Sequence, residues 1–155
     1  MKRKLLFVCV HNSARSQMAE AFLNRICSED CEAQSAGLEP GTLNPLVVEV
    51  MREVGLDISR SKTKSVSDIL RTGQLFSCVI TVCDQAGAQR CPVFPGAGQR
   101  LHWSFPDPAA CVGTREERLE QIRKIRDAIQ ARVEEWCQAV CQTVTGSFPV
   151  GVSAE

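Results

Sequence analysis

The fold of this protein is decided by residues 4–20, which read KLLFVCVHNSARSQMAE. Residues 4–8 form a short apolar run that ends at a polar loop, which predicts a buried strand. From Ser16 onward the apolar residues recur at helical spacing, at Met18, Ala19, Phe22, Leu23 and Ile26. A strand, a short loop and a helix in this order predict a β–α unit of a parallel sheet.

The rest of the chain continues this alternation. The β-branched run at residues 78–82 predicts a strand that is covered on both faces, and residues 32–36 and 100–103 are two further candidate strands. Asn44 and Pro45 form an N-cap followed by a proline, which predicts a helix that ends at Gly55. Residues 66–70 are typical of one or two helical turns. A capping box at residues 114–117 opens a long helix, whose apolar residues recur every three or four positions as far as residue 140.

Strands that alternate with helices predict an α/β fold of three layers, a four-stranded parallel sheet flanked by helices on both faces. No linker or internal repeat divides the 155 residues. We therefore predict a single catalytic domain over residues 1–142, followed by a flexible tail over residues 143–155 that contains two glycines and a proline.

Composition excludes several classes of function. The 18 basic and 18 acidic side chains balance, so no global field attracts nucleic acid or an anionic membrane surface. No stretch approaches the roughly 20 apolar residues of a membrane span, and the N-terminal apolar run is too short for a signal peptide. We predict a cytoplasmic protein that is a monomer and binds neither nucleic acid nor a membrane.

Nine cysteines are an odd number, so they cannot all pair within the chain, and their spacing is irregular. In a reducing compartment such a surplus indicates chemistry, metal binding or burial. The pairs Cys27/Cys31 and Cys137/Cys141 have zinc-like spacing, but neither pair has an obvious partner pair. We predict no metal site, and the roles of these four residues, Cys78 and Cys111 stay open.

Cys9 and Arg15 are separated by five residues and followed by Ser16. A turn from a strand into a helix directs backbone N–H groups and the helix dipole at one point, which favours a bound anion. Arg15 adds a bidentate guanidinium contact, and the same field favours the thiolate form of Cys9. We predict a nucleophilic Cys9 in an oxyanion-binding loop made of Val10, His11, Asn12, Ser13, Ala14, Arg15 and Ser16. The alternative is that Cys9 is a small buried hydrophobe.

Residues 7–20, FVCVHNSARSQMAE, resemble the opening of the low-molecular-weight tyrosine phosphatases and of the arsenate reductases that share their fold. The resemblance extends from about residue 4 to residue 140, with Ser35-Ala36-Gly37 and Asn44-Pro45 also matching. One departure is Ala14, where many members have a second cysteine. The resemblance implies that Asp107, before Pro108, is a general acid that protonates a leaving oxygen. Without the resemblance, the sequence predicts only that Asp107 lies in a turn.

Residues 83–96, CDQAGAQRCPVFPG, resemble the redox segment of thioredoxin-coupled arsenate reductases, and His102-Trp103 also fits them. The resemblance implies a relay in which Cys9 attacks arsenate, Cys83 attacks Cys9 and releases arsenite, and Cys91 then forms a disulfide with Cys83. Seven residues separate Cys83 from Cys91, one more than the family pattern, and a flexible Gly87 would absorb the difference.

The leading hypothesis is an arsenate reductase with no tightly bound cofactor, reduced by thioredoxin or a similar external dithiol. A potassium ion near Asn12, Glu20 and Ser35 is implied by the resemblance. The alternative is a phosphatase of phosphotyrosine or other phosphomonoesters that uses Cys9, Arg15 and Asp107, and a reductase would retain some phosphatase activity. Alanines follow Asp107–Pro108 and the chain has no tyrosine, which disfavours a deep phenol pocket. A non-catalytic phosphate or redox sensor is a third alternative.

Overall fold

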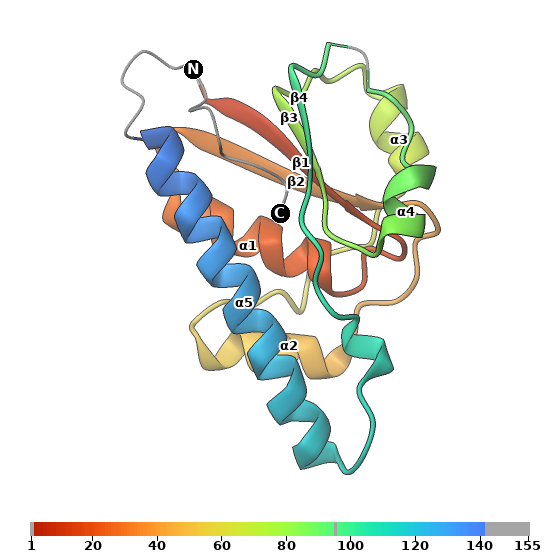
Figure 1. The fold of residues 1–155 in the computed structure, drawn as a ribbon, viewed down its shortest axis with the longest axis vertical. Helices are drawn as coiled ribbons and strands as arrows, with labels where there is room; N and C mark the ends of the chain where they lie inside the picture. The colour runs from red at the N-terminus through yellow and green to blue at the C-terminus, as the bar shows by residue number, and fades with distance from the viewer. Residues whose placement is uncertain (1, 95, 142–155) are drawn as a thin grey trace.

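The computed structural model describes residues 2–94 and 96–141, and the predicted flexible tail, residues 143–155, lies outside the described residues. At its centre is a parallel sheet in the order β2-β1-β3-β4 (Figure 1). The strands are β1 (Arg3–Cys9), β2 (Cys31–Gly37), β3 (Cys78–Thr81) and β4 (Gln99–His102). All four strands predicted from the sequence are present, within two residues of the predicted ends.

The described part of the chain also forms five α-helices and one short 3₁₀ turn, of which the turn and the last helix follow the last strand. They are α1 (Arg15–Ile26), α2 (Pro45–Glu53), α3 (Val66–Arg71), α4 (Gln85–Arg90), η1 (Pro108–Ala110) and α5 (Arg115–Cys141). The predicted caps are confirmed, because the Asn44 side chain accepts a hydrogen bond from Leu46 N. In the capping box, Glu117 N donates to Thr114 Oγ1 and Thr114 N donates to Glu117 Oε1, both at 3.2 Å.

The sheet buries both faces, which confirms the three-layer prediction. Along β1, Leu5, Phe7 and Cys9 point into a large apolar cluster with α1, α2 and α5. Leu6 and Val8 point the other way, into a smaller cluster closed by α3. Figure 1 shows α1 and α5 on one side of the sheet and α3 and α4 on the other. Because successive side chains of a strand point to opposite faces of the sheet, neighbouring residues of β1 pack against different helical layers.

Helix α4 was not predicted, because residues 85–90 carry no apolar periodicity and contain a glycine. The signal that identifies it is Asp84, whose carboxylate accepts a hydrogen bond from Gly87 N at 2.7 Å and caps the helix. Gly87 is therefore a buried helical residue in this structure, and its role in absorbing the extra residue during rearrangement stays a prediction. Most of the segment between Cys83 and Cys91 is therefore helical in this structure.

Candidate active site

Cys9 is the last residue of β1, and its side chain is only 3% exposed. Asn12 N donates to Cys9 Sγ at 3.1 Å, and Ser16 Oγ lies 2.8 Å from the same sulfur. Ser16 Oγ also accepts from Asn12 Nδ2 at 2.7 Å, which leaves its own proton free to point at Cys9. The Cys9 sulfur therefore has two hydrogen-bond partners, Asn12 N and Ser16 Oγ, in the described structure.

Asn12 gives the loop its curvature. Its backbone has a φ of 54°, a left-handed conformation that asparagine tolerates better than most residues. Its side chain is fully buried, and its Oδ1 accepts from Gln17 Nε2 at 3.1 Å and from Lys64 N at 2.9 Å. The hydrogen bonds of the Asn12 side chain therefore hold the loop in its conformation. His11 in contrast is exposed, and its Nδ1 lies 2.9 Å from the carbonyl oxygen of Glu39.

Arg15 is the first residue of α1, and its exposed fraction is 8%. Its Nη1 donates to the Phe105 carbonyl at 3.1 Å, and its Nη2 lies 3.8 Å from Asp107 Oδ2. The other carboxylate oxygen of Asp107 accepts from Ala109 N at 2.9 Å and caps η1. The structure thus brings Asp107, which follows the edge strand β4, next to Arg15 at the end of the loop that begins at Cys9.

Cys83 follows β3, the neighbour of β1, and is completely buried. It belongs to the same apolar cluster as Cys9. A Cβ built on Gly87 would lie 2.9 Å from Cys83 Sγ and 3.0 Å from Val10 Cγ2, so this thiol sits between α4 and the loop. Burial raises the pKa of the Cys83 thiol to about 11, and the negative charge of Cys9 adds to the shift while Arg15 opposes it.

Cys91 lies at the opposite end of α4 and packs in the smaller cluster, with Phe76 and Phe94. Its thiol is buried as well, which raises its pKa, and the Arg100 guanidinium opposes that shift. The six residues of α4 span about 9 Å. Disulfides need Cα atoms within about 4.4–6.8 Å of each other. Cys83 and Cys91 therefore cannot join while α4 is intact.

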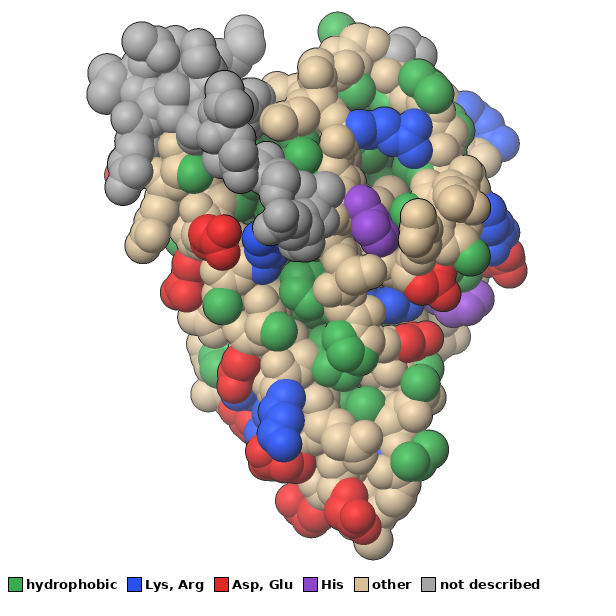
Figure 2. All heavy atoms as spheres, in the orientation of Figure 1, with side chains coloured by type: hydrophobic (Ala, Val, Ile, Leu, Met, Phe, Trp, Pro, Cys, Tyr) green, Lys and Arg blue, Asp and Glu red, His purple; other side chains and the backbone are tan. Residues whose placement is uncertain are grey.

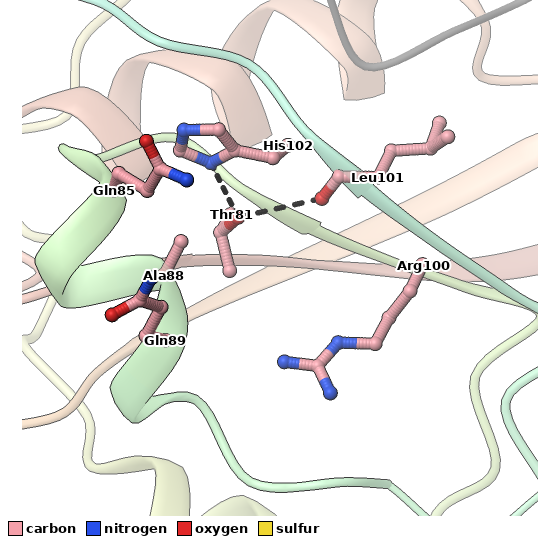
Figure 3. A pocket seen from close by; sticks show the side chains of 7 residues that line it. All are labelled: Thr81, Gln85, Ala88, Gln89, Arg100, Leu101 and His102. Atoms are coloured by element: carbon pink, nitrogen blue, oxygen red, sulfur yellow. Dashed lines mark hydrogen bonds between the residues drawn. The ribbon is translucent and has the colours of Figure 1, made fainter.

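Helix α4 contacts the rest of the protein through few buried side chains, and its Arg90 forms an ion pair with Glu39. Gly87 is its only buried residue, and a hollow of about 300 Å³ lies between the helix and β4. Figure 3 shows Gln85 and Gln89 of α4 facing this hollow across from Arg100 and His102. A segment with so little buried apolar surface opens at low cost. No feature of the sequence predicted this hollow.

The potassium ion implied by the resemblance does not fit the residues at its expected position. Both acceptor positions of Asn12 Oδ1 are taken, by Gln17 and by the backbone of Lys64. Ser35 Oγ donates to Glu20 Oε1 at 2.5 Å. The Lys64 ammonium lies 3.9 Å from the same carboxylate oxygen. A protein cation therefore already faces the carboxylate that would bind the metal ion.

Acidic and basic side chains are interspersed on the face shown in Figure 2, in agreement with the balanced composition. Within residues 2–94 and 96–141, no helix is long and apolar enough to cross a membrane. An anion would therefore be held here by local groups, such as the N–H groups of the loop and Arg15.

The model of the low molecular weight phosphotyrosine protein phosphatase family matches residues 4–145. The chain belongs to this family. Within it, an arsenate reductase of Shouchella clausii is 41% identical over 138 residues, which cover 88% of this chain and 96% of that protein. A solved arsenate reductase in the phosphate binding state has a TM-score of 0.74 at 29% identity, covering 88% of this chain and 97% of that one. A thioredoxin-dependent arsenate reductase of Corynebacterium glutamicum has a TM-score of 0.59 at 29% identity, covering 86% of this chain and 63% of that one. The predicted family and fold are confirmed.

Proposed function

We propose that this member of the phosphatase family is an arsenate reductase. The observation that carries the proposal is the second buried thiol, Cys83, which lies behind the oxyanion loop in the same buried cluster as Cys9. A phosphatase returns its nucleophile by hydrolysis and has no use for a thiol at this position. The similarity to arsenate reductases over 88% of the chain supports the same conclusion.

In the first step the Cys9 thiolate attacks the arsenic atom of arsenate. The loop N–H groups and Arg15 hold the remaining oxygens. One As–O bond breaks as the S–As bond forms, and Asp107 donates a proton so that the oxygen leaves as water. Arg15 and Asp107 lie within 3.8 Å of each other, which supports one site for the bound anion and the departing oxygen.

In the second step the Cys83 thiolate attacks Cys9 Sγ. The electron pair of the S–As bond passes to arsenic, which is reduced from As(V) to As(III) and leaves as arsenite. Two thiols have then supplied two electrons and are joined as a Cys9–Cys83 disulfide. In the third step the Cys91 thiolate attacks Cys83 Sγ and releases Cys9. The distance along α4 requires this helix to unwind before the third step.

An external dithiol would then reduce the Cys83–Cys91 disulfide. We assign this role to thioredoxin or a protein of the same class, because unwinding of α4 would carry the disulfide out of the core to a surface that another protein can reach. The related Corynebacterium glutamicum enzyme is described as thioredoxin-dependent. A cytoplasmic location fits a cycle that must regain free thiols. The predicted monomer stays a prediction.

The phosphatase alternative uses the same Cys9, Arg15 and Asp107. The residues after Asp107–Pro108 are Ala109 and Ala110, which are exposed and too small to build a wall for a phenol ring. We therefore expect any phosphatase activity to be a weak side reaction on small phosphomonoesters.

The substitution Cys91→Ser tests the relay. Cys9 and Cys83 are still present, so we expect one arsenite per enzyme and then a stall with thioredoxin, because the Cys9–Cys83 disulfide is buried. Mass spectrometry should find Cys9 joined to Cys83 in this variant, and Cys83 joined to Cys91 in the wild type. The matched control is Cys111→Ser, which removes a half-buried thiol and should turn over normally. Repeated turnover of Cys91→Ser at the wild-type rate would rule out the relay.

A further inference from the structure

Segment 62–65 crosses behind the oxyanion loop and is tied to it through the backbone. Lys64 N donates to Asn12 Oδ1 at 2.9 Å, and the Lys64 carbonyl accepts from Gly37 N at 2.8 Å. The loop lies directly on the end of β2, since a Cβ on Gly37 would be 2.8 Å from Asn12 N. A charge on this segment therefore acts on the loop at short range.

Glu20 places a carboxylate in the same region. Its side chain is 24% exposed, and it lies one turn after Ser16 on α1, so both side chains emerge on the same side of the helix. Ser16 contacts the Cys9 sulfur. An uncompensated carboxylate here would repel an anion in the loop and would also be costly to keep from water.

The Lys64 side chain supplies the compensating charge. Its Nζ lies 3.9 Å from Glu20 Oε1 and donates to the Lys62 carbonyl at 3.3 Å. The same Lys62 carbonyl accepts from Gln17 Nε2 at 3.1 Å. The ammonium thus stands between a carboxylate oxygen and a carbonyl oxygen, which are the kinds of oxygen ligand that a hard cation would choose.

We infer that Lys64 is a built-in counter-ion for Glu20, taking the place of a potassium ion, and that it keeps the oxyanion loop competent without any metal cation. Lys64 is a positioning residue, because it acts on the bound anion through Glu20 and Asn12. As regards turnover, the inference rests on the proposed reductase activity. Its effects on stability and on phosphate binding do not depend on that activity.

The test compares the wild type with Lys64→Met, which removes the charge, and with Lys64→Arg, which keeps it. Thermal unfolding and the Kd for inorganic phosphate are measured in potassium chloride, sodium chloride and choline chloride at equal ionic strength. The wild type and Lys64→Arg should show no preference for potassium. Lys64→Met should bind phosphate about two- to fivefold more weakly in choline, the scale of a partly exposed ion pair, and potassium should restore part of the loss.

The double variant Lys64→Met/Glu20→Gln separates the charge effect from a simple loss of packing. With Glu20 neutral, no counter-ion is needed, so phosphate affinity should return toward the wild-type value. A wild type that unfolds at higher temperature in potassium than in choline would overturn the inference. The inference would also be overturned if Lys64→Met weakened phosphate binding equally in the presence of Glu20 and in the Glu20→Gln background. If phosphate binding behaves as expected while arsenate is not reduced, the proposed function fails and the role of Lys64 stands.

Discussion

Removing the cap of α4 should accelerate the last step of the relay. Asp84 Oδ1 accepts from Gly87 N at 2.7 Å, and loss of an N-cap costs about 1 kcal/mol of helix stability. Since about 1.4 kcal/mol is a factor of ten, the population of unwound α4 in Asp84→Ala should rise about fivefold. If unwinding limits the transfer from Cys9–Cys83 to Cys83–Cys91, that transfer should become about fivefold faster.

The assay is a single turnover with arsenate and no external reductant. Samples are quenched with acid, free thiols are alkylated, and the two disulfides are quantified by mass spectrometry over time. Asp84 also helps to raise the pKa of Cys83, after burial and the charge of Cys9, so its removal changes reactivity as well as helix stability. Asp84→Asn is therefore the matched variant, because asparagine caps a helix well but carries no charge.

A second control removes a cap elsewhere. Thr114 Oγ1 accepts from Glu117 N at 3.2 Å and caps α5, so Thr114→Ala should destabilise the protein by a similar amount without affecting the transfer. The reasoning is refuted if Asp84→Ala converts the first disulfide to the second no faster than the wild type. It is also refuted if Asp84→Asn is accelerated as much as Asp84→Ala, since charge would then be responsible and not helix unwinding.

Three further predictions concern the earlier steps. Cys9→Ser should lose arsenate reduction and any phosphatase activity yet still bind phosphate by calorimetry, because a serine hydroxyl does not ionise near neutral pH; full activity would contradict the assignment. Asp107→Asn should slow reduction by about 10²–10⁴-fold with a much smaller change in arsenate affinity, and a loss of only a few-fold at every pH would make Asp107 a turn residue. The rate of arsenite release by Cys91→Ser in a single turnover should rise about tenfold per pH unit between about pH 6 and 8. Burial raises the pKa of Cys83 to about 11, so only a small fraction of this thiol is ionised in that range, and the fraction grows tenfold per pH unit. A rate that does not change with pH would show that Cys83 is not the attacking thiol.

Features that depend on residues close to one another in the sequence could be predicted from the sequence. The apolar run before Cys9 and the helical spacing after Ser16 predict the strand, loop and helix, because local patterning determines which face of each element is buried. The caps at Asn44 and Thr114 were correct for the same reason, since a cap hydrogen bond spans only two or three residues. The resemblance to the phosphatase family identified the remaining candidate residues, Asp107 among them.

Tertiary structure alone decided how distant residues meet. Cys9 and Cys83 lie in one cluster because their strands, β1 and β3, are neighbours in the sheet, whereas Cys91 lies in the cluster on the other face. The sequence did not reveal that α4 is a helix with a single buried residue, nor that Lys64 faces Glu20 from another segment. Strand order and the packing of faces depend on contacts summed over the whole chain, and no local pattern of residues encodes them.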